Sequence, residues 1–158
     1  MVLAHQLVFS FSNNTIMRSV IQFDGIKFWV DQDIIHCNLD SVFFSKYEKA
    51  NIEEIFYNAI PILSKGTYMP FLINIENLER PCALKIFNII SKSAQIKRLV
   101  LSRIFLVNSI ELKVILSLNN IIVKQVVPNK IFRGYDAAVN FCKNDYMIFN
   151  EVSEHRFS

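Results

Sequence analysis

The chain is poor in the residues on which small-molecule chemistry usually depends. It contains only 3 glycines, 3 histidines and 3 cysteines among 158 residues. Loops that hold phosphates or dinucleotides are rich in glycine, because their backbone approaches the ligand closely and adopts left-handed conformations. The scarcity of glycine therefore argues against a nucleotide-binding loop of this kind.

The cysteines, Cys37, Cys82 and Cys142, are odd in number and lie far apart. No Cys-x-x-Cys pair is present, which argues against a zinc knuckle or a thioredoxin-type redox centre. Reduced, largely buried thiols in a cytosolic protein fit this pattern best, so we expect a cytoplasmic location. We expect neither a metal nor a cofactor.

No strong excess of charge is present either, since the formal net charge is only +3. The densest basic cluster is Lys97, Arg98 and Arg103, which we interpret as a solvated rim because nucleic-acid-binding domains usually carry a stronger basic bias. The apolar start of the chain lacks the preceding basic residues of a signal peptide and is too short to span a bilayer. We therefore expect no nucleic acid, no membrane span and no secretion.

Hydrophobic residues are abundant, at 52% of the chain with 14 phenylalanines, which is enough for the full core of one domain. Residues 26–30 alternate between apolar and other side chains, and residues 34–39 follow a turn at Asp31–Asp33. These two segments predict a β-hairpin. The polar and aromatic residues 40–49 are interpreted as a connection.

Helical and strand patterns alternate in the remainder of the chain. Helix one begins near Asn51, contains Pro61 and ends at Lys65–Gly66. Ile110, Val114, Leu118 and Ile121 line one side of the helix that follows Asn108. The further predicted elements are strands at 69–75, 103–107 and 130–133, and helices at 81–94 and from Tyr135. We therefore predict an α/β fold, with a mixed four- or five-stranded sheet and helices packed on it.

This layout resembles a STAS-like domain, the fold of anti-sigma-factor antagonists, and more narrowly a group of small bacterial STAS-like proteins. The resemblance is carried by Phe28-Trp29, Pro70–Ile75, Ile104–Ser109, Ile131-Phe132 and Asp136–Ala138. The resemblance covers about residues 22–143. We expect a domain over 21–144, an N-terminal extension over 1–20 and a C-terminal tail over 145–158. Antagonists of this family carry a phosphorylatable Ser or Thr after the central strand. This chain has Asn77–Cys82 there without a hydroxyl group, so a kinase-controlled partner switch is not expected.

Three pairs of residues have side chains of the types found in reactive or metal-binding sites. His36 and Cys37 are adjacent in a predicted strand, where neighbouring side chains point to opposite faces, so a nucleophile–base pair is geometrically poor. Glu76 and Glu79 flank the loop after the central strand and are interpreted as solvated carboxylates rather than an acid–base pair. Asp31 and Asp33 are interpreted as turn residues and not as metal ligands.

The aromatic residues Trp29, Phe43, Phe44 and Tyr47 give the most useful functional indication. Either they form an exposed apolar patch that marks a partner surface, or they fill a second core layer under residues 40–49, and the sequence leaves both alternatives open. We assign partner binding to these four residues together with Asn77, Glu79 and Arg80. The chain is thus expected to be a non-enzymatic interaction or regulatory domain with a protein partner, including a second copy of itself.

The alternative to an interaction domain is a module that binds a small apolar ligand or lipid. An enzyme that uses Glu76, Glu79 or Cys37 ranks third, and it requires a cleft that gathers at least two of these residues.

Overall fold

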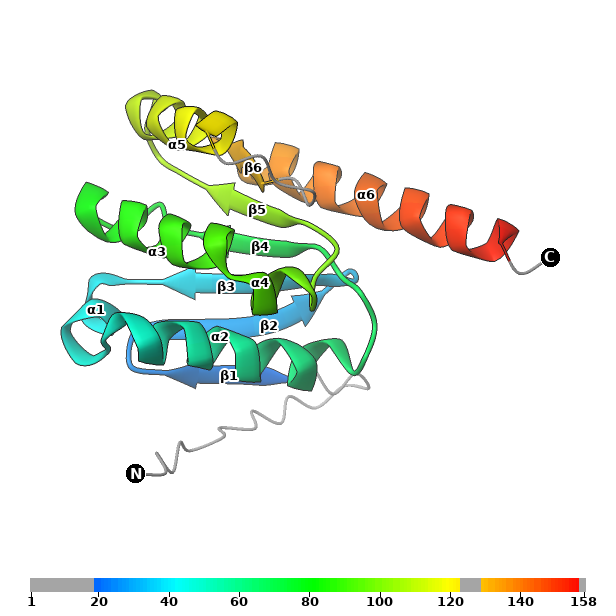
Figure 1. Cartoon of the computed structure of the whole chain (residues 1–158), viewed down its shortest axis with the longest axis horizontal. Coiled ribbons are helices and arrows are strands. Elements are labelled where there is room, and N and C mark those ends of the chain that lie inside the picture. The colour runs from blue at the N-terminus through cyan, green and yellow to red at the C-terminus, as the bar shows by residue number, and fades with distance from the viewer. Residues whose placement is uncertain (1–18, 123–128, 157–158) are drawn as a thin grey trace.

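Figure 1 shows the computed structural model, which describes residues 19–122 and 129–156. The strands form one six-stranded sheet whose spatial order, β1-β2-β3-β4-β5-β6, is also their order in the chain. The predicted α/β class is therefore confirmed, with six strands in place of four or five. The elements are β1 (Val20–Phe23), β2 (Ile26–Asp31), β3 (Ile34–Leu39), α1 (Ser41–Lys46), α2 (Lys49–Ser64), β4 (Phe71–Asn74), α3 (Arg80–Lys92), α4 (Ala94–Lys97), β5 (Arg103–Leu106), α5 (Ile110–Ile122), β6 (Asn129–Phe132) and α6 (Tyr135–His155).

The sheet begins as an antiparallel meander and continues as a parallel sheet. β1 pairs with β2 and β2 with β3 in antiparallel register, whereas β3, β4, β5 and β6 run parallel to one another. The parallel strands need crossover connections, which the intervening helices supply. The predicted hairpin is present as β2 and β3, and β1 is an additional strand preceding it.

A tight contact at Gly25 joins the first turn to α1. Gly25 has φ +81°, and a Cβ atom there would lie 2.7 Å from the backbone nitrogen of Phe43 and closer still to the carboxylate of Asp40. The Asp40 N–H donates to the Gly25 carbonyl at 2.9 Å, and the Asp40 side chain accepts from the Val42 N–H at 2.9 Å. The segment expected to be a connection therefore contains a capped helix, α1.

The main core lies on one face of the sheet, under α2, α3 and α5. It includes Phe28 and Cys37 from the meander and Phe71, Ile73 and Phe105 from the parallel strands. Pro61 lies within α2, which ends at Lys65 in the left-handed conformation, as the sequence predicts. This apolar layer holds more buried residues than the core on the other face of the sheet.

Arg103 is buried in this same layer, so it does not belong to a solvated basic rim with Lys97 and Arg98. Its Nη1 donates to the carbonyl oxygens of Ile90 and Ser91, at 3.0 Å each, near the end of α3. Burial lowers the pKa of the guanidinium to about 10. Side chains alternate between the two faces of the sheet along β5. Arg103 therefore shares the face of the buried Phe105, which lies two residues further along the strand.

Among the described elements, α6 is the helix that covers the opposite face of the sheet. Ala138 and Cys142 of α6 pack with Ile34, Leu72, Ile104 and Leu106 in a second, smaller core. α6 continues to His155, so residues 145–155, expected to be a tail, are helical. Its C-terminal half runs past the ends of the strands (Figure 1). In the described parts of the chain, no helix combines the length and apolar character needed to cross a membrane.

Candidate partner-binding surfaces

Trp29 lies on the α6 side of the sheet, at the edge of the area that α6 covers. It is half-buried and stacks on His36, with ring centroids 4.9 Å apart and planes 8° apart. His36 in turn lies 6.3 Å from the ring of Tyr135, the first residue of α6, and Lys27 Nζ lies 5.4 Å from the Trp29 ring. We call the rings of Trp29, His36 and Tyr135, with Lys27 beside Trp29, the aromatic row.

Within this row, burial shifts His36 toward its neutral form. Burial lowers its pKa, and the nearby carboxylate of Asp31 opposes this effect only partly. Cys37 lies on the other face, fully buried in the main core, where burial raises the pKa of its thiol well above the ordinary value. The strand therefore separates the His36 and Cys37 side chains, as the sequence argument predicts.

The other predicted aromatic residues do not share the surface of Trp29. Phe43 and Tyr47 are buried in the main core with α1, and Phe44 packs against that core while half-buried. The Tyr47 hydroxyl donates to Asp24 Oδ2 at 2.8 Å, and Lys46 Nζ contacts Asp24 Oδ1 at 2.7 Å. Phe43 and Tyr47 are therefore core residues, in the main core rather than in the second layer that was the alternative, and the four aromatic residues do not form a single exposed patch.

Asn77 and Glu79 are exposed in the loop between β4 and α3, and Arg80 is exposed as the first residue of α3. The loops after β4 and β5 are tied together, because Asn108 Nδ2 donates to the Glu76 carbonyl at 2.7 Å. A cavity of about 340 Å³ lies beside this contact, lined by Leu78, Arg80, Asn108, Ser109, Glu111 and Leu112. Arg80 is thus the only member of the predicted loop set that borders it.

An exposed apolar surface that the sequence alone does not indicate is on α5. Ile110, Val114, Leu118 and Ile121 share one side of this helix, as their spacing indicates, but they are 55%, 51%, 55% and 75% exposed. The buried residues of α5 are Leu112 and Leu116, which turn toward the sheet. We call Ile110, Val114, Leu118 and Ile121 the α5 stripe. A groove along it is lined by these residues with Lys113, Ser117 and Arg133.

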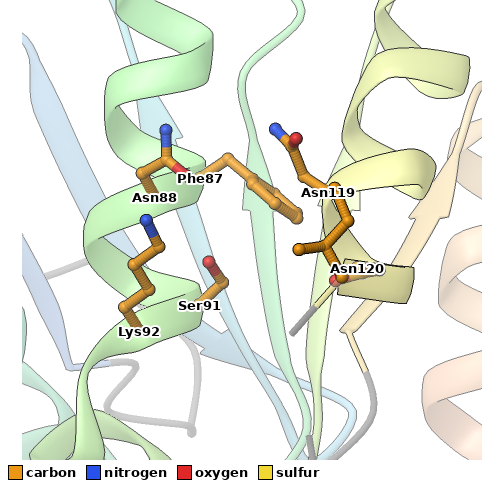
Figure 2. A pocket seen from close by; sticks show the side chains of 7 residues that line it. Phe87, Asn88, Ser91, Lys92, Asn119 and Asn120 are labelled. Carbon is orange, nitrogen blue, oxygen red and sulfur yellow. The ribbon is translucent and has the colours of Figure 1, made fainter. Parts of the chain in front are cut away.

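Beside the buried Leu112 and Leu116, two polar side chains of α5 face α3 and β6. Figure 2 shows Asn119 and Asn120 of α5 across a small cleft from Asn88, Ser91 and Lys92 of α3, with Phe87 between the helices. Asn120 Nδ2 donates to the carbonyl of Asn129 at 2.9 Å, and Asn129 Nδ2 donates to Asn120 Oδ1 at 3.0 Å. These bonds tie α5 to β6 in the rotation that leaves the α5 stripe in solvent.

Within residues 19–122 and 129–156, no group of three or more His, Cys, Asp or Glu side chains is arranged to hold a metal ion. No family model matches the chain, and no curated protein or solved structure matches it.

Proposed function

We propose that this chain is a non-enzymatic interaction domain that docks a protein partner through the α5 stripe. The supporting observation is that four large aliphatic residues on one side of a helix are each more than half exposed. Single exposed aliphatic residues are ordinary on protein surfaces, but a contiguous apolar patch is not. The STAS-like character of the scaffold stays part of this proposal, supported by the opening hairpin and the alternation of helices and parallel strands that follows it.

The size of the α5 stripe is consistent with this function. Four such side chains present on the order of 400–500 Å² of apolar surface, which is in the range where patches on monomers are often functional. At about 25 cal/mol per Å², covering them contributes on the order of 10 kcal/mol before the entropy of association is subtracted. Because association itself costs on the order of 4–15 kcal/mol, we expect at most a weak, reversible complex from this surface alone.

Trp29 and the loop at Asn77–Arg80 take secondary roles in this proposal. Trp29 offers a rigid aromatic surface on the α6 side of the sheet, and Arg80 borders the cavity next to the start of α5. Arg80 and Glu111 line the same cavity next to the first turn of α5. A partner seated on the α5 stripe contacts these two residues at that end of the helix.

A retention experiment tests the proposed function. The full chain is immobilised and exposed to purified chain and, separately, to extract of the organism that encodes it. Leu118→Glu is compared with Ile62→Glu on α2, a matched control because Leu118 and Ile62 are both 55% exposed. We expect protein retained by the wild type to be lost with Leu118→Glu and kept with Ile62→Glu. Equal retention by all three proteins, or none by the wild type, contradicts the proposal.

A second candidate function, small-ligand binding, is favoured by the cavity beside Arg80. Its lining combines Leu78 and Leu112 with the polar groups of Arg80, Asn108 and Ser109, which suits a small ligand with both apolar and polar parts. Native mass spectrometry of the purified chain tests this: a bound adduct that Arg80→Ala removes supports the second candidate, and a clean apo mass contradicts it.

A further inference from the structure

We propose that the partner of the α5 stripe is a second copy of this chain, with the two α5 helices packed antiparallel about a two-fold axis. This inference rests on the proposed function and names the occupant of the same surface. Three properties of α5 carry it: the spacing of the α5 stripe, the placement of its charges, and the hollow at Ser117.

The α5 stripe reads nearly the same in both directions along the helix. Val114 and Leu118 lie two residues on either side of the level of Leu116, and Ile110 and Ile121 lie six and five residues from it. In an antiparallel pair centred at this level, Val114 meets Leu118 of the second copy and Ile110 meets its Ile121. A two-fold interface requires this self-complementarity, because each residue must find its counterpart on an identical surface.

The charges of α5 are compatible with this pairing. Glu111 and Lys113 are the only charged residues between Ile110 and Ile122, and both lie in the first half of the helix. In the antiparallel arrangement Lys113 is level with Asn119 of the second copy, so identical charges do not meet. In a parallel arrangement Lys113 is level with Lys113, which is unfavourable in a desolvated contact. The antiparallel direction is therefore preferred.

A hollow in the α5 stripe gives the second helix a place to seat. Ser117 is the smallest side chain lining the groove, and it is flanked there by Val114, Leu118 and Ile121. A small residue among large aliphatic ones allows two helix axes to approach to about 8–10 Å, with a side chain of one helix inserted beside the other. The Val114 side chain of the second copy fits this hollow, while Lys113 and Arg133 stay on its rim.

The area of the proposed contact is small for a dimer. The two α5 stripes together bury on the order of 1,000 Å², which lies at the lower limit for a specific interface. We therefore expect a reversible, concentration-dependent dimer rather than a permanent one. The proposed dimer contact consists of the two α5 stripes, and Trp29 lies outside it.

Disulfide trapping tests both the partner and the direction of packing. Val114→Cys and Leu118→Cys are each made in a Cys82→Ser background, because Cys82 is only half-buried whereas Cys37 and Cys142 are buried. The two proteins, distinguished by mass, are mixed and oxidised gently at a concentration where the wild type sediments as a dimer. We expect the mixed disulfide to exceed both homodisulfides, since only the antiparallel pair places position 114 of one copy opposite position 118 of the other.

Each other outcome overturns the inference. Excess of the two homodisulfides indicates parallel helices, and a wild-type dimer without any disulfide indicates another surface. A wild-type chain that stays monomeric over a wide concentration range excludes the second copy altogether. In that case, retention of a different protein that depends on Leu118 leaves the proposed function standing, so the two failures are distinguishable.

Discussion

Asn120 and Asn129 exchange a pair of amide hydrogen bonds that join the inner side of α5 to the start of β6. One bond runs from Asn120 Nδ2 to the Asn129 carbonyl and the other from Asn129 Nδ2 to Asn120 Oδ1. Leu112 and Leu116 are buried against the sheet and Asn120 faces β6, so the side of α5 opposite the two leucines faces solvent and carries the α5 stripe. The orientation of the candidate interface is therefore set by the buried leucines together with the asparagine pair.

Replacing Asn129 by Ala removes its side-chain amide from this pair. We expect the free energy of unfolding to fall by about 1–2 kcal/mol, because a partly buried acceptor on Asn120 is left without its donor. Urea denaturation of the full chain measures this change. Asn119→Ala is the matched control, since Asn119 lines the same cleft and its replacement exchanges a weak helix former for a strong one. Equal destabilisation by both variants contradicts the role given to Asn129.

Gly25→Ala tests the contact between the first turn and α1. A Cβ at Gly25 collides with the backbone of Phe43, and the positive φ adds strain for any L-residue. We expect a loss of about 3 kcal/mol in the free energy of unfolding. At Gly134 a Cβ meets no atom within 4 Å, so Gly134→Ala is expected to lose less than about 1 kcal/mol. Thermal and urea unfolding of both variants give the comparison, and similar losses contradict it.

The stability of the chain is expected to depend on the protonation of His36. Its pKa is lowered in the folded state, so the unfolded chain binds the proton more readily. This contribution to stability is fully present above the ordinary histidine pKa of 6.5 and is lost as the pH falls below it toward the folded value. His36→Phe keeps an aromatic ring beside Trp29 but removes the titration.

Urea unfolding of the wild type and His36→Phe at pH 7.5 and pH 5.5 checks this expectation. The wild type should lose more stability than His36→Phe on acidification, because the other titrating groups are common to both proteins. An identical loss in the two proteins shows that His36 does not carry the effect.

Much of the fold could be predicted from local signals. β4 and β5 are short apolar runs, α3 begins with proline at its first turn, and the end of α2 is marked by Lys65 and Gly66. Each signal depends on a residue and its close neighbours, so one sequence is enough to detect it. The same is true of the separation of His36 from Cys37, which follows from strand alternation alone.

The features that could not be predicted depend on contacts between distant segments. The α5 stripe has the spacing of a core face, but in the structure Leu112 and Leu116 form the buried side of α5 and the stripe residues are more than half exposed. Arg103 has the appearance of a surface residue, and its burial depends on the carbonyl groups at the end of α3. Phe43 is buried because α1, too short for a clear apolar period, folds over the main core. Such placements follow from tertiary packing.

Hydrogen–deuterium exchange at two protein concentrations tests the central claim most directly. The full chain is labelled well above and well below the concentration at which it associates, so that the dimer and the monomer are compared without any substitution. We predict that amides of residues 110–122 exchange more slowly at the higher concentration, while those of β2 around Trp29 exchange equally at both. Slower exchange around Trp29 with no change in 110–122 contradicts the claim that α5 carries the interaction surface.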